Sequence, residues 1–187
     1  AYYALDTAAT DTWTELSGIG TKIASGDYFN TRSTQSDPND DGTAGPYSLG
    51  FGFPLFQSSD TGRYAWIGVN GAMAISPTPS DTGNVNGSGG TFTSNWSIPG
   101  YLLGGLDEPR NFISPFYNDF AVPPKTDNLP NVHGAIWYMK TGSKFIVEWD
   151  SMQNNNRAAD TLISFQAVLD SSDGSITFIY RNTGIAG

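Results

Sequence analysis

The stretch from Gly134 to Arg181 constrains the fold most, because it holds four strand-length runs separated by turn residues. The runs are rich in β-branched and aromatic residues and cover 134–140, 144–150, 161–170 and 175–181. Gly142 and Gly174 lie between them and tolerate the positive φ that tight hairpins need. The pattern predicts an antiparallel meander with one buried face.

The rest of the chain predicts further strands joined by long polar loops. Asn70-Gly71 lies between two apolar runs and predicts a two-residue hairpin turn. Short segments at 13–16 and 20–24 are expected to pair with each other, and residues 1–12 are expected to form an extended N-terminal segment. We therefore predict one all-β domain over residues 1–187: an antiparallel, jelly-roll-like β-sandwich with long loops.

Composition narrows the possible partners. The chain of 187 residues carries a net charge of −9, which disfavours nucleic acid because an acidic surface repels phosphate. The absence of Cys excludes disulfides, zinc-thiolate sites and cysteine nucleophiles. No apolar run approaches the roughly 20 residues of a membrane span, so we expect no membrane span.

Four segments together resemble the NIDO-type extracellular domain and related β domains of large bacterial surface proteins. They are Leu49–Phe56, Trp66–Ile75, Ile113–Phe120, and a last group made of Phe145–Trp149, Ser164–Asp170 and Asp173–Tyr180. The most specific element is Phe-Gln-x-x-Leu followed by Asp-Gly-x-Ile-x-Phe-x-Tyr. The resemblance implies an extracellular β-sandwich used in adhesion or matrix assembly, without enzyme activity and without fixed binding residues.

An acidic motif lies in an insertion that departs from the family pattern. It reads Asp37-Pro38-Asn39-Asp40-Asp41-Gly42, which matches the first half of a calcium loop. The predicted calcium ligands are Asp37, Asn39, Asp41 and the backbone carbonyl of Thr43. The twelfth position is Ser48 instead of a bidentate Glu, so a solvated turn rich in Asp and Asn is the alternative.

Three other carboxylates could act as catalytic groups. Glu148 and Asp150 flank Trp149 and share one strand face, where they could act as an acid–base pair on a glycan. The more ordinary interpretation is a solvent-facing side of the strand. Asp119 lies between apolar residues and is expected to cap a turn, and the single histidine, His133, is expected to be exposed.

Aromatic side chains suggest a ligand surface. Trp96 lies inside a polar loop, where it could stack on a sugar ring or partner chain, or close one end of the sandwich. Tyr101 is a weaker candidate of the same kind.

The first functional hypothesis is a noncatalytic adhesion or surface-assembly module, extracellular or at the cell surface, that binds a surface glycan or protein or copies of itself. Residues 2–10 could add as a strand to a neighbour's sheet edge and build a filament. The alternative is a carbohydrate-binding module of a secreted protein. A glycan-active enzyme using Glu148, Asp150 or Asp119 is the third hypothesis.

Overall fold

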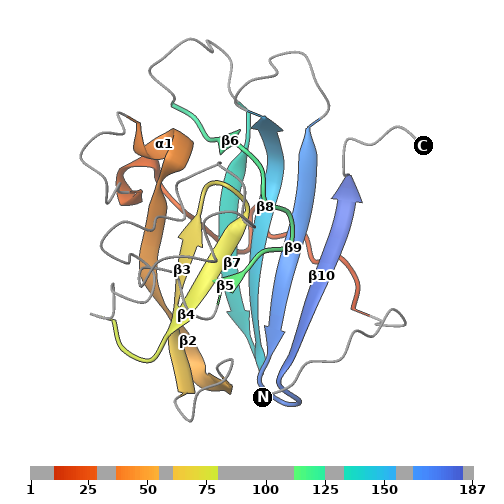
Figure 1. The fold of residues 1–187 in the computed structure, drawn as a ribbon. Coiled ribbons are helices and arrows are strands. Elements are labelled where there is room, and N and C mark those ends of the chain that lie inside the picture. Colours follow the sequence, from red (N-terminus) through yellow and green to blue (C-terminus); the bar gives the residue numbers. More distant parts are fainter. Residues whose placement is uncertain are drawn as a thin grey trace, which may run out of the picture.

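The computed structural model describes residues 11–28, 37–54, 61–79, 112–124, 133–154 and 162–182. They form two antiparallel sheets packed face to face (Figure 1), so the predicted all-β sandwich is confirmed. The elements, in chain order, are β1 (Thr21–Lys22), the 3-10 helix η1 (Ser25–Asp27), α1 (Pro38–Asp41), β2 (Thr43–Pro54), β3 (Thr61–Gly68), β4 (Ala72–Ser76), β5 (Phe112–Ile113), β6 (Phe120–Ala121), β7 (Ala135–Thr141), β8 (Lys144–Asn154), β9 (Ile163–Asp170) and β10 (Ser175–Asn182).

The larger sheet has the strand order β1-β7-β8-β9-β10, with β6 paired to the far end of β8. Strands β7 to β10 are the four runs expected from the sequence, so the predicted meander is confirmed. The expected pairing of 13–16 with 20–24 is wrong. Thr21 and Lys22 form β1 and pair with β7, because the edge of β7 offers a ready row of backbone partners.

The smaller sheet has the order β2-β3-β4-β5. The predicted hairpin between β3 and β4 exists, but Gly68 pairs directly with Ala72. Three residues therefore connect the strands, instead of the two that were predicted. Gly71 takes the left-handed conformation with φ +80° that ends this turn.

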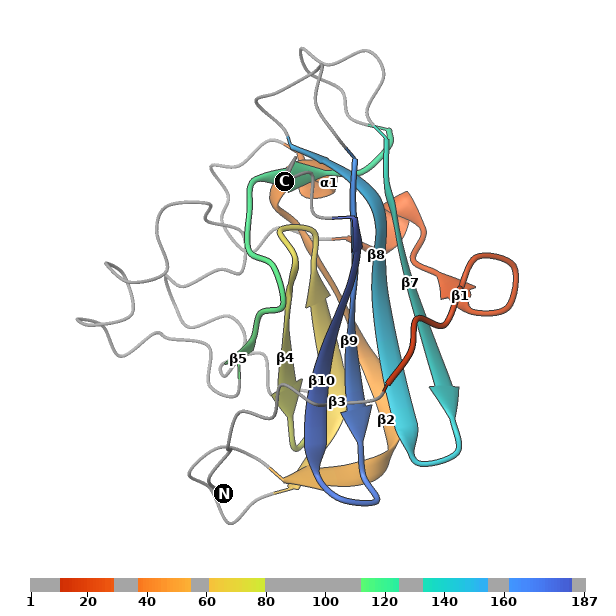
Figure 2. The ribbon, with the colours of Figure 1, turned by 90° about the vertical axis from the view of Figure 1, so that its right-hand side faces the viewer.

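The core lies between the two sheets and is dominated by aromatic rings. Trp149 is completely buried, stacks on Phe165 with ring centroids 5.2 Å apart, and donates its indole N–H to Gly68 O at 2.9 Å. Because Trp149 belongs to β8 and Gly68 to β3, this bond links the two sheets. Figure 2 shows the layers edge-on.

The turn between β9 and β10 is organised by Asp170. Its carboxylate accepts the Ser172 hydroxyl at 2.6 Å and the Ser172 backbone N–H at 2.9 Å, and Lys144 lies 3.8 Å away. These contacts lower the pKa of Asp170 to about 2, with the Ser172 hydroxyl as the largest cause. The ionised carboxylate is therefore part of what stabilises this hairpin.

Asp170→Asn is expected to lower the free energy of unfolding by about 1–2 kcal/mol at pH 7. The folded pKa is below the unfolded one, so the contribution is complete above about pH 4 and is lost as the pH falls towards 2. Urea denaturation of both proteins at pH 7 and near pH 2 measures the difference. A gap of the same size at both pH values would contradict the assignment.

Candidate functional site

The larger sheet has two chemically different faces. Along β8, Phe145, Val147 and Trp149 point into the sandwich, so the intervening Ile146, Glu148 and Asp150 point to the outer face. On β9 the same alternation places Gln166 and Val168 on the outer face. A charged group and an amide thus lie side by side, because Glu148 pairs directly with Gln166.

Residues 11–17, which we call the strap, cross this outer face before the chain reaches β1. The strap is the red segment running beside β8 in Figure 2. Leu16 is completely buried and packs with Ile146 and Val168. The Gln166 amide bonds the main chain of Thr14 in both directions, which fixes the strap as a short strand would.

Glu148 lies beneath the strap and is completely buried. Its Oε2 accepts the Leu16 N–H at 3.0 Å and the Gln166 amide N–H at 2.7 Å. Its Oε1 accepts no hydrogen bond. Burial raises the pKa of Glu148 to about 7; the two hydrogen bonds oppose the rise, and the charges of Glu15 and Asp150 add to it.

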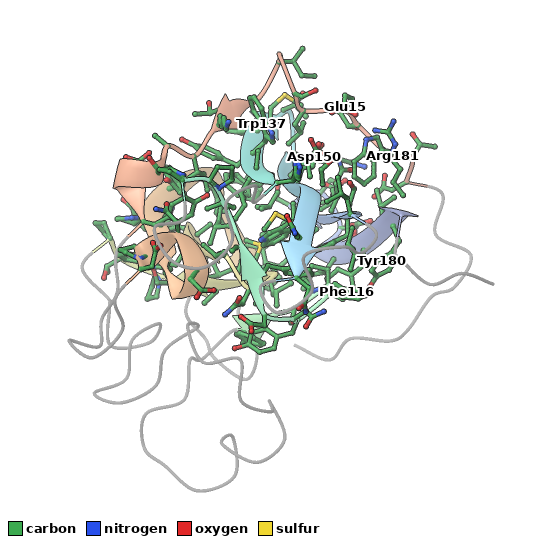
Figure 3. All side chains as sticks on the ribbon, turned by 90° about the horizontal axis from the view of Figure 1, so that it is seen from above. Glu15, Phe116, Trp137, Asp150, Tyr180 and Arg181 are labelled. Carbon is green, nitrogen blue, oxygen red and sulfur yellow. The ribbon has the colours of Figure 1, made fainter. Side chains whose placement is uncertain are left out.

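Glu15, on the strap, lies near Asp150 and Arg181, as the labelled residues of Figure 3 show. Its carboxylate accepts Arg181 Nη1 at 2.6 Å and the Ser17 hydroxyl at 2.8 Å, and the Ser17 hydroxyl is the main reason why the pKa of Glu15 is lowered. The Arg181 guanidinium also lies over the Trp13 ring, 5.5 Å from its centroid. The strap is thereby tied to β10.

Asp150 completes the group from a bulge in β8. Pairing between β8 and β9 shifts register between Trp149 and Met152, and Ser151 has a φ of 52°. The Oδ1 of Asp150 accepts the hydroxyls of Ser151 at 2.9 Å and Ser164 at 3.2 Å. One oxygen each of Glu15, Glu148 and Asp150 lie within 4.8 Å of one another.

The sequence correctly placed Glu148 and Asp150 on one face, but the solvent-facing interpretation is wrong for Glu148. The strap covers that carboxylate. The sequence of β8 alone does not predict that residues 11–17 lie over it. Glu15 and Gln166 were missed as members of the site. A single amide inside the apolar run of β9 was the one available signal, because a buried amide needs a polar partner.

The structure places the predicted calcium loop at one end of the sandwich. Asp37 is the N-cap of α1 and accepts the Asn39 N–H at 2.9 Å, while the Asn39 amide donates to Pro124 O at 2.7 Å. Asp41 ends the helix, and Thr43 begins β2 with its side chain buried. The Oδ1 of Asn39 and the Oγ1 of Thr43 accept no hydrogen bond.

The other predicted site residues are only partly covered by the described residues. Asp119 is buried next to β6, and His133 is exposed as expected. Trp96 and Tyr101 lie outside the described residues, as does the 2–10 segment.

These features define a two-sheet β-sandwich with a strapped outer face. The model of the NIDO-related family matches residues 2–187, so the chain belongs to that family and the suspected resemblance is confirmed. Searches of curated proteins and of solved structures gave no match. Among the described helices, none has the length and apolar character needed to cross a membrane.

Proposed function

We propose that this domain is a noncatalytic extracellular module that acts in adhesion or surface assembly, by binding a surface glycan or protein or copies of itself. Family membership supports an extracellular β module, and the edge of the larger sheet supports a role in contact. Within the described part of the chain, β10 pairs only with β9. Edge strands offer backbone groups to a neighbouring strand.

The side chains of β10 carry the proposal. Phe178 and Tyr180 lie two positions apart on one face of the strand and are 41% and 45% exposed, and the Tyr180 hydroxyl donates to Pro115 O at 2.6 Å. The edge of β10 therefore offers both two half-exposed aromatic rings and backbone groups that can pair with another strand. A second copy of the chain added at this edge would bury both rings and extend the sheet.

Phe178→Lys is expected to weaken self-association at least about tenfold, because a charged side chain at a sheet edge opposes strand addition. Sedimentation velocity over a wide concentration range measures the association. The matched control is Ile19→Lys, which adds the same charge at a residue 65% exposed in the turn before β1. A wild-type chain that stays monomeric throughout would exclude self-assembly and leave a glycan or protein partner.

The noncatalytic part of the proposal is supported by the burial of Glu148. Its side chain is 0% exposed, whereas a glycosidase acid must reach the sugar oxygen that it protonates. Its hydrogen bonds to Leu16 and Gln166 serve to hold the strap.

A carbohydrate-binding module is the second candidate. Phe178 and Tyr180 are neighbours on one face of β10, and half-exposed rings in a row suit stacking on sugar rings. Retention of variants on insoluble polysaccharides would show which of two surfaces binds the sugar. Loss in Phe178→Ala indicates the β10 edge, and loss in Trp96→Ala indicates the loop that contains Trp96.

The loop at residues 37–43 is the proposed calcium site of this module. The buried oxygens of Asn39 and Thr43 that accept no hydrogen bond support a cation there. Calorimetric titration of calcium into wild-type and Asp37→Asn protein tests this loop, and equal binding by both proteins would argue against it.

A further inference from the structure

Three carboxylates gather where the strap crosses β8. Glu15, Glu148 and Asp150 are the one group of three potential metal ligands found among the described residues. Among the described residues, Arg181 on β10 bonds Glu15, and Lys22 on β1 lies over the Trp137 ring, 5.8 Å from its centroid. Gln166 on β9 is neutral.

One buried carboxylate oxygen of Glu148 lacks a hydrogen-bond donor, which independently points to a ligand. The residue is completely buried, yet only Oε2 has donors and Oε1 accepts no hydrogen bond. An unsatisfied carboxylate oxygen in the interior is costly. A bound cation would satisfy this oxygen and reduce the repulsion from Glu15 and Asp150.

The other polar partners of Asp150 and Glu15 are two hydroxyls and one guanidinium. The Ser151 and Ser164 hydroxyls both bond Oδ1 of Asp150, which fixes this carboxylate beside Glu148. Arg181 competes for Glu15, but its side chain is 58% exposed, and exposed ion pairs are weak. The three carboxyl groups and the one guanidinium leave this region with an excess of negative charge.

We propose that Glu15, Glu148 and Asp150 bind a hard divalent cation, calcium, which fastens the strap to β8. Oxygen-only ligands favour calcium or magnesium over zinc or copper. Calcium is preferred because it accepts irregular arrangements of carboxylates and water, whereas magnesium demands a near-ideal octahedron. The site is distinct from the predicted loop at residues 37–43 and does not depend on the proposed adhesive function.

Glu148→Gln is expected to weaken calcium binding at this site at least about tenfold, because it removes a charged ligand but keeps a side chain able to accept the Leu16 N–H. Calorimetry measures calcium binding, and terbium luminescence excited through tryptophan reports proximity to Trp13 and Trp137. Asp150→Asn should give a similar loss. Asp173→Asn, at an exposed turn, and Asp37→Asn, in the other loop, should leave this site unchanged.

Two further measurements make the assignment specific. Arg181→Ala should strengthen calcium binding by several-fold, since it removes the cation that competes for Glu15. Hydrogen exchange at the Leu16 amide should slow on addition of calcium in the wild type but not in Glu148→Gln.

Circular dichroism establishes that each variant is folded, and Asp150→Asn provides the test if Glu148→Gln is not. Wild-type protein that binds no calcium at millimolar concentration would overturn the proposal. Binding that survives in Glu148→Gln and Asp150→Asn but is lost in Asp37→Asn would also overturn it, by assigning the ion to the loop at 37–43.

Discussion

Gly71→Ala should lower the free energy of unfolding by roughly 3 kcal/mol or more, through backbone strain and a steric clash. Gly71 has a φ of +80°, which L-residues rarely adopt. A Cβ built at this position lies 1.9 Å from Phe116 O and 3.0 Å from the Phe165 ring. Backbone cannot give way as a flexible side chain does, so the turn between β3 and β4 must move. Urea denaturation measures the loss.

Gly142→Ala is the matched control for the strain alone. Gly142 has a φ of +57° in the β7–β8 turn, and a Cβ there meets nothing within 4 Å. Its expected cost is about 1–2 kcal/mol. Equal losses in the two variants would show that the contact with Phe116 O has no energetic weight.

Trp149→Ala is expected to lower the free energy of unfolding by about 3–5 kcal/mol, because it removes a completely buried tryptophan from the core. It also removes the stacking on Phe165 and the bond to Gly68 O that connects the sheets. Equilibrium denaturation followed by far-ultraviolet circular dichroism measures the effect without relying on tryptophan fluorescence.

Trp149→Phe separates the two contributions. Phenylalanine keeps a ring against Phe165 but leaves Gly68 O without its donor, so we expect a smaller loss of about 1–3 kcal/mol. A Trp149→Phe variant as unstable as Trp149→Ala would indicate that the hydrogen bond dominates over packing.

Strands could be predicted from the sequence where the local alternation of apolar residues and the turn glycines specify them. In β8 the alternation of Phe145, Val147 and Trp149 with their neighbours specifies one buried face, and Gly142 specifies the turn before it. The three-residue loop at Gly71 shows the limit of that approach. Asn-Gly indicates a tight turn, but the observed register of β3 and β4 leaves three residues in the loop and places Gly71 against Phe116 O and the Phe165 ring.

The strapped site could not be predicted in the same way. Leu16 contacts Glu148 across 132 positions of sequence, and Thr14 contacts Gln166 across 152. No local spacing encodes such pairs, so Glu148 appeared solvent-facing when β8 was considered alone. The short helix at Pro38–Asp41 was missed for the opposite reason. Pro38 directly after the capping residue Asp37 is typical of a helix start, but the segment was expected to form only a turn.

Because the strap packs on strands from the other end of the chain, it is synthesised long before its partners. The Gln166 side chain, which bonds the main chain of Thr14, is made 152 residues later, so a growing chain carries Leu16 without its contact to Val168 until β9 has left the ribosome. During that interval Leu16 and the residues around it are open to chaperones, proteases and other nascent chains. The first described segment of the domain can thus reach its final place only after β9 has been made.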